Sequence, residues 1–171
     1  MKKIFFGLLI VTLGCGYTTK AFRGTGSIYV KPVQNNIRIT QETRAYSSYQ
    51  TYPILIEKKL TNAIVDEFRL RSNYTITSES SQSYTLECSI ISYTQNALQY
   101  SDSDDVTERR LRLHVKMRYL GPQGELLKER TVVGEATYYL QGLYAKSESE
   151  AFEDLIDDTS RRIVESIADD W

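Results

Sequence analysis

The sequence predicts an α+β fold, a two-layer sandwich in which two amphipathic helices pack on one face of a mostly antiparallel four-stranded sheet. Two segments carry apolar residues at spacings of three and four, which is typical of amphipathic helices. Other segments alternate apolar and polar residues, which is typical of strands with one buried face. In the order strand, helix, three strands, helix, every element has one apolar face to bury, and the simplest solution places both helices on the same side of the sheet.

The composition indicates an ordinary globular chain. Its 171 residues include 21 Lys+Arg and 22 Asp+Glu, so the length suits one domain with a hydrophobic core. The net charge of −1 gives no support to a general nucleic-acid binder, which usually carries a strong basic excess. One His and two Cys argue against a multi-ligand His/Cys metal site. The unusual feature is 13 Tyr against 5 Phe.

The N-terminus has the pattern of an export signal. Two lysines open the chain, and residues 4–13 carry no charge. That apolar run is too short to span a bilayer as a helix, which takes about 20 residues, but it is typical of a secretory signal. Gly14-Cys15 at its end resembles a bacterial lipobox, in which the Cys thiol is diacylated, the chain is cut before Cys and the new amine is acylated. The alternative is an ordinary signal peptide cut nearby, with Cys15 incidental.

The lipobox interpretation divides the chain into a signal peptide at 1–14, a lipidated tether at 15–26 and a single domain at 27–171. The mature chain would have 157 residues, with 19 basic and 22 acidic side chains. No cofactor is expected beyond the covalent N-acyl and S-diacylglycerol groups on Cys15. Cys88, in an alternating apolar segment, is then the one remaining thiol, and we expect it in the core.

In the first half of the chain, alternation at 27–33 predicts a strand, and the polar stretch 34–52 predicts a long loop. A helix is expected from Pro53, with Thr51 as its N-cap, to about Arg71. Its apolar stripe consists of Leu55, Ile56, Leu60, Ala63, Ile64 and Phe68.

In the second half, a short strand is expected first, at 74–77, and is not counted among the four. The three strands that follow the helix in the predicted order are expected at 84–93, 110–120 and 126–139. The last two are separated by Gly121-Pro122-Gln123-Gly124, which predicts a hairpin. Ser147 and Glu150 have the spacing of a capping box. A second helix follows, and its apolar positions are Phe152, Leu155, Ile156, Thr159, Ile163, Val164, Ile167 and Ala168.

Basic residues alternate along the strand 110–120 and form a candidate binding surface for a glycolipid. The candidate residues are Arg110, Arg112, Lys116 and Arg118, with His114 in the same row. Such a row suits the phosphates and carboxylates of a glycolipid, which Arg can bind bidentately. The alternative is a solvated strand face with cross-strand ion pairs.

The hairpin register decides how many of these charges are paired. A four-residue turn at 121–124 would place Lys116 opposite Glu129 and Arg110 opposite Glu135. The same register would place Arg112 and Arg118 opposite Val133 and Leu127, without a partner.

The excess of tyrosine permits a second surface. Tyrosines near loops and strand ends suit a protein interface, because one rigid ring supplies both apolar area and a hydroxyl. The candidate contacts are Tyr46, Tyr49, Tyr138 and Tyr139. The alternative is a tyrosine-rich sheet, since Tyr is a good strand former.

No catalytic constellation is recognisable, so no catalytic residue and no enzyme activity are expected. The chain has no phosphate loop, no G-x-S-x-G and no H-E-x-x-H. Its acidic residues fall on outer helix faces and in turns, where solvated surface is the simplest interpretation. Asp102, Asp104 and Asp105 lack the full ligand series of a calcium loop, and no metal site is expected.

Several segments together resemble the LptE (RlpB) family of lipopolysaccharide-assembly lipoproteins. They are Cys15-Gly16-Tyr17, the strand that runs into Asn35-Asn36, the helix segment 60–68, the Arg/Leu strand 109–120 with its Gly turn, Tyr138-Tyr139 and the acidic C-terminal helix from Glu150. The resemblance implies two helices on one face of a mostly antiparallel sheet, in agreement with the pattern of the residues.

The resemblance also implies a non-enzymatic role. Members are anchored in the inner leaflet of the outer membrane and face the periplasm. They plug the LptD β-barrel, assist its assembly and help deliver lipopolysaccharide to the outer leaflet. The implied partners are therefore an LptD-like barrel, lipopolysaccharide and the outer membrane, with no nucleic acid. The alternative is an accessory lipoprotein of another envelope machine, such as a cell-wall synthase activator.

Overall fold

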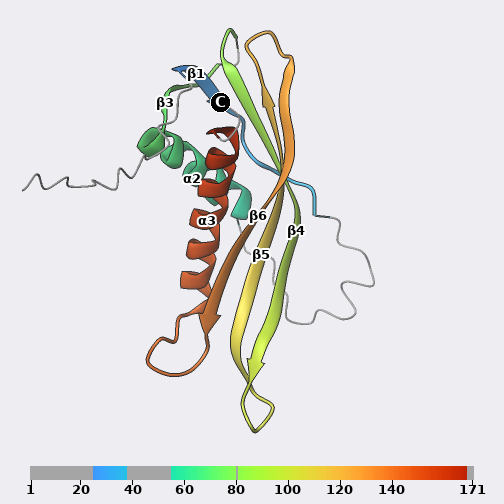
Figure 1. Cartoon of the computed structure of the whole chain (residues 1–171), viewed down its shortest axis with the longest axis vertical. Helices are drawn as coiled ribbons and strands as arrows, with labels where there is room; N and C mark the ends of the chain where they lie inside the picture. Colours follow the sequence, from blue (N-terminus) through green and yellow to red (C-terminus); the bar gives the residue numbers. More distant parts are fainter. Residues whose placement is uncertain (1–24, 38–54, 80, 169–171) are drawn as a thin grey trace, which may run out of the picture.

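A computed structural model describes residues 25–37, 55–79 and 81–168 of the chain (Figure 1). Six strands and two helices are found in these ranges. The strands are β1 (Thr25–Val30), β2 (Gln34–Asn35), β3 (Asn73–Thr77), β4 (Tyr84–Tyr100), β5 (Val106–Leu120) and β6 (Leu126–Tyr139), and the helices are α2 (Ile56–Arg71) and α3 (Glu148–Ala168). The predicted signal peptide, tether, Thr51 and Pro53 lie outside the described residues, and the predicted domain division stays a prediction.

The α+β class is confirmed, but the sheet is mixed and has six described strands rather than four. Its order is β3-β1-β4-β5-β6, with β2 paired to β4. β4, β5 and β6 form an antiparallel meander, whereas β1 runs parallel to both β3 and β4. The parallel half follows from the connection: α2 lies between β1 and β3 in the chain, and a helical crossover joins parallel strands.

Both helices cover the same face of the sheet (Figure 1). α3 packs mainly on β6 and β5, and α2 packs on α3 and on β3 and β1. The core between the layers is built from the predicted apolar faces, including Leu60, Ile64 and Phe68 of α2 and Leu155, Ile163 and Ile167 of α3. Predicted periodicity and observed burial therefore agree for both helices, except at Leu55, which is 54% exposed.

The two helices start differently. The capping box of α3 is confirmed: the Glu150 N–H donates to Ser147 Oγ (3.2 Å), and the Ser147 N–H donates to Glu150 Oε2 (2.8 Å). At α2 the N-cap position is occupied by Leu55, in a left-handed conformation with φ of 62° and no side-chain cap. The first turn of α2 is therefore held by backbone bonds from Lys58 and Lys59 to the Leu55 carbonyl.

Candidate functional site

The face of the sheet that points away from the helices carries the predicted basic row. Leu111, Leu113 and Val115 of β5 are fully buried under the helices, so the residues between them lie on the opposite face. We call this surface the cationic face and define it by the ion-paired residues Lys31, Glu87, Arg110, Arg112, Lys116, Arg118, Glu129 and Glu135, together with His114.

The predicted register of the β5–β6 hairpin is wrong by two residues. Arg112 lies opposite Glu135 and Arg118 opposite Glu129, whereas Lys116 and Arg110 lie opposite threonines. One residue of the shift comes from the connection, which is 121–125 rather than 121–124 because Leu120 pairs with Leu126. The other comes from an irregularity between Tyr119 and Leu120, next to the turn. A shift of two keeps every side chain on its predicted face, so the cationic face survives the correction.

The corrected register pairs the two arginines that were expected to have no partner. Arg112 Nε donates to Glu135 Oε2 at 2.8 Å, and Arg110 Nε lies 2.8 Å from Glu135 Oε1. Glu135 thus bridges two guanidinium groups. The prediction that Arg112 faces an apolar residue is wrong, and the prediction of an Arg110–Glu135 ion pair is correct in its partners but not in its cross-strand register.

A second group of ion pairs runs across the sheet from β6 through β5 and β4 to the end of β1. Lys116 Nζ lies 2.8 Å from Glu129, and Arg118 contacts both Glu129 (3.4 Å) and Glu87 (3.0 Å). Lys31, just after β1, pairs with Glu87 at 3.0 Å. The hydrogen bond from Lys116 holds the pKa of Glu129 below its usual value. Arg118 is therefore partnered twice, contrary to the prediction that it lacks a partner.

The ion-paired side chains of the cationic face carry a net positive charge. The eight ion-paired side chains comprise five cations and three carboxylates, an excess of two positive charges. The side chains of the four predicted binding residues are 31–47% exposed, and solvent-exposed ion pairs of this kind are worth less than about 1 kcal/mol each. A hollow of about 190 Å³ lies among Lys31, Glu87, Lys116 and Arg118. An anion can therefore compete for these cations at small cost.

The predicted tyrosine contacts have separate locations. Tyr46 and Tyr49 lie outside the described residues. The prediction that Tyr138 is a surface contact is wrong, because only 2% of this residue is exposed. Its hydroxyl accepts a hydrogen bond from Gln95 Nε2 at 3.0 Å. Tyr139, the next residue on β6, points to the other face and is exposed.

Tyr139 belongs to a group of exposed apolar residues that no local pattern in the sequence indicates. The β4–β5 turn and the β6–α3 loop lie at the same end of the molecule (Figure 1). The large exposed apolar residues of this end, which we call the apolar tip, are Leu98, Tyr100, Tyr139, Leu140, Leu143 and Tyr144. Leu143 is 89% exposed. A concentration of exposed apolar residues is typical of an interaction site.

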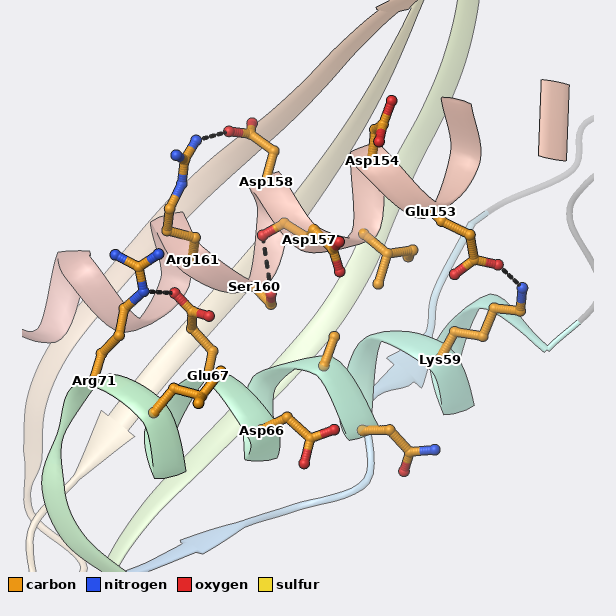
Figure 2. Close-up of a pocket in the computed structure, with 14 residues that line it drawn as sticks. Lys59, Asp66, Glu67, Arg71, Glu153, Asp154, Asp157, Asp158, Ser160 and Arg161 are labelled. Carbon is orange, nitrogen blue, oxygen red and sulfur yellow. Dashed lines mark hydrogen bonds and ion pairs between the residues drawn. The ribbon is translucent and has the colours of Figure 1, made fainter. Parts of the chain in front are cut away.

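A groove of about 690 Å³ lies between α2 and α3 (Figure 2). Its walls are rich in carboxylates, and Figure 2 shows ion pairs from Lys59 to Glu153 and from Arg71 to Glu67. Burial raises the pKa of Asp157, helped by the charges of Glu153 and Asp154. In the described ranges no three His, Cys, Asp or Glu side chains come together as metal ligands would.

Two residues with reactive side chains, Cys88 and Asp105, have surroundings that explain them structurally. Cys88 is 3% exposed, as predicted, and burial raises the pKa of its thiol to about 12, so the thiolate nucleophile is suppressed. Ser103 donates to Asp105 Oδ2 at 3.0 Å inside the acidic turn, so this carboxylate helps hold the turn. Neither helix in the described ranges has the length and apolarity needed to cross a membrane.

The fold and the site together define an α+β domain with one sheet face covered by two helices and the other formed by the ion-paired residues of the cationic face. The chain belongs to the LptE family, described as lipopolysaccharide-assembly, whose model matches residues 25–171. Membership of this family supports a role in lipopolysaccharide assembly.

Solved structures show the same fold at low sequence identity. The rare lipoprotein B from Shewanella oneidensis is 16% identical, with a TM-score of 0.51 over 82% of this chain and 94% of its own. A lipoprotein B from Nitrosomonas europaea is 14% identical, with a TM-score of 0.53 over 85% of this chain and 83% of its own. Among curated proteins no match is detected.

Proposed function

We propose that this protein is an outer-membrane lipoprotein that plugs an LptD-like β-barrel, assists the assembly of that barrel and helps deliver lipopolysaccharide to the outer leaflet. The observation that carries the proposal is the family match over 25–171, which spans every described element. In this account Cys15 bears the lipid anchor in the inner leaflet, the domain faces the periplasm, and the role is non-enzymatic.

The cationic face is the proposed contact for lipopolysaccharide. Its cations form a row along β5, with same-face neighbours about 6.6–6.8 Å apart. Arg112 and Arg118 can bind phosphate oxygens bidentately, and Arg110 and Lys116 add charge on either side of His114. The carboxylates of the face hold these side chains in place until a multiply charged anion displaces them.

The apolar tip is the proposed contact for the barrel. Its tyrosines offer rigid rings with a polar hydroxyl, which are enriched at protein interfaces. Of the predicted contacts Tyr138 and Tyr139, Tyr139 is exposed and stays a proposed contact, whereas Tyr138 is buried. Tyr46 and Tyr49, which lie outside the described residues, also stay proposed contacts.

A binding experiment tests the glycolipid part of the proposal. The mature chain with Cys15→Ser is titrated with lipopolysaccharide, and the double variant Arg112→Glu/Arg118→Glu is compared with Lys58→Glu/Arg69→Glu, which reverses two exposed charges on α2. We expect the β5 variant to bind at least about tenfold more weakly and the α2 control to bind normally. If the β5 variant bound lipopolysaccharide as well as the wild type, the cationic face would be solvated surface and not the binding site.

The second candidate function, an accessory lipoprotein of another envelope machine, has the same fold and anchor but a different partner. Its favouring observation is the apolar tip, which fits any protein partner with an apolar pocket. Identification of the protein that co-purifies with the chain separates the two functions.

A further inference from the structure

Within the described sheet β6 is an edge strand, and one hydrogen bond fixes the direction in which its outward backbone groups point. The Glu135 N–H donates to Asp158 Oδ2 of α3 at 2.9 Å, so it points away from β5. Backbone groups in a strand alternate in direction. The N–H and C=O groups of Glu129, Thr131 and Val133 therefore also point outward, away from β5.

The far end of this edge is closed by the protein itself. Asp158 takes the Glu135 N–H, and the Tyr139 carbonyl accepts a hydrogen bond from the Lys146 N–H at 3.0 Å. At 129–133, by contrast, no strand or loop of the described part of the chain pairs with the outward groups. An open stretch of edge backbone is a template for pairing with another chain.

A hollow of about 390 Å³ runs beside this open stretch. It is lined by residues 130–133 of β6 and by Arg162, Glu165 and Ser166 of α3. Arg130 lies opposite Met117 and so projects on the helix side of the sheet, into the wall of the hollow. In the described ranges no carboxylate is ion-paired with Arg130, whereas Arg162 is held by Asp158 at 2.6 Å.

We propose that residues 129–133 of β6 take an extended segment of a partner protein as an added strand, with a carboxylate of that segment directed towards Arg130. An extended backbone presents donors and acceptors at the same spacing as the edge, which gives affinity, and its alternate side chains give specificity. The hollow gives room for the side chains that fall on the helix side.

A second copy of this chain fits the edge less well. Two β6 edges paired antiparallel about Thr131 would place the Arg130 side chains of the two copies on the same face as diagonal neighbours. Diagonal neighbours across strands are within reach of long side chains, and like charges there are unfavourable. A segment with an acidic residue replaces this repulsion by an ion pair, so charge complementarity favours a foreign strand.

The experiment places a photo-crosslinking amino acid at Thr131 of the full-length lipidated protein in native outer membranes. The cross-linked segment is then identified by mass spectrometry. The same cross-link is measured with Arg130→Glu and, from a crosslinker at Val133, with Thr131→Pro and Thr131→Ala. Proline at 131 removes an outward N–H and no β5–β6 bond, so the sheet tolerates it. Alanine keeps the N–H and is the matched control.

We expect cross-links to a segment of the partner that contains Asp or Glu, about a tenfold loss with Thr131→Pro, a clear loss with Arg130→Glu and no loss with Thr131→Ala. Circular dichroism confirms that the variants are folded. Cross-links to a second copy, to lipid alone or to nothing, or cross-links unaffected by both variants, overturn the inference.

The inference rests on the proposed function in one respect, which is that the partner supplying the strand is the LptD-like barrel. If the tagged wild type co-purifies without a barrel, the proposed function fails. The cross-link still reads out whether an acidic strand occupies the edge, so the two failures are distinguishable.

Discussion

Gly134 of β6 lies against Thr159 of α3 so closely that a Cβ atom on the glycine would be 1.8 Å from Thr159 Oγ1 and 2.9 Å from Thr159 Cα. Thr159 is fully buried, and its hydroxyl donates to the Leu155 carbonyl at 2.6 Å. Since the obstacle includes helix backbone, a side-chain rotation cannot make room. The contact sets how closely α3 approaches β6, and it holds the strand that carries Glu129 and Glu135.

We therefore expect Gly134→Ala to lower the free energy of unfolding by about 1–3 kcal/mol, the usual range for overpacking a core. Urea denaturation monitored by circular dichroism measures it. Thr137→Ala, on the exposed face of the same strand, is the control and should change stability by less than about 0.5 kcal/mol. Equal stability of Gly134→Ala and the wild type would show that α3 lies farther from the sheet.

Asp158 links α3 to the edge of β6, and we expect Asp158→Asn to destabilise the protein in a pH-dependent way. Burial acts to raise the pKa of Asp158, but the Glu135 N–H and the guanidinium groups of Arg162 and Arg161 outweigh it and hold the pKa below its usual value. A lowered folded-state pKa gives stability above the unfolded-state pKa of about 3.9, which is lost as the pH falls through the folded-state value.

The substitution should therefore cost about 1–2 kcal/mol at neutral pH and less at about pH 3. Unfolding curves at the two pH values give the difference, with Asp66→Asn, an exposed carboxylate of α2, as the control. A cost that is the same at both pH values would contradict the assignment.

Removal of a carboxylate from the cationic face should strengthen anion binding. Glu135 occupies the guanidinium groups of both Arg110 and Arg112, so Glu135→Gln leaves them available to phosphates. We expect lipopolysaccharide to bind several-fold more tightly, about 2- to 10-fold. Titration of the purified variants measures this, and Glu153→Gln on α3 controls for net charge. Weaker binding by Glu135→Gln would show that the carboxylate orients the arginines for the ligand.

The buried thiol offers a simple check of the core. In the variant Cys15→Ser, Cys88 is the remaining thiol, and we expect its reaction with a disulfide reagent at about pH 8 to be slowed by on the order of 100-fold relative to the urea-unfolded chain. Absorbance of the released thiol follows the reaction. Rapid labelling of the native protein would place Cys88 at an accessible surface.

The sequence predicted the elements whose pattern is local. The alternation over 126–139 gave both ends of β6, and the helical stripes gave the buried faces of α2 and α3. The same alternation indicates that Tyr138 is buried, because it lies on the same face of β6 as the buried Val132 and Ala136. The prediction of Tyr138 as a surface contact rests on its position near a strand end, and its register on β6 contradicts that prediction.

The wrong predictions concern the register between neighbouring strands, which the sequence of one segment alone does not determine. β4 continues to Tyr100, beyond its predicted end, and stays paired with β5 as far as Val106. An irregularity between Ile90 and Ser92 reverses the phase of the alternation, so no single alternating pattern marks the whole strand. A similar irregularity at Tyr119/Leu120, together with a connection one residue longer than predicted, shifts the β5–β6 register by two and gives Arg112 and Arg118 their partners. The apolar tip escaped prediction because Leu98, Leu140 and Leu143 are brought together by the fold.

The central claim, that the protein plugs an LptD-like barrel, is tested most directly by native mass spectrometry of the full-length tagged chain purified in mild detergent from outer membranes. The account predicts a complex of one chain with one large β-barrel, identified as LptD-like by peptide sequencing. Recovery of the chain as a lone monomer, or in a complex with a cell-wall synthase, would contradict it.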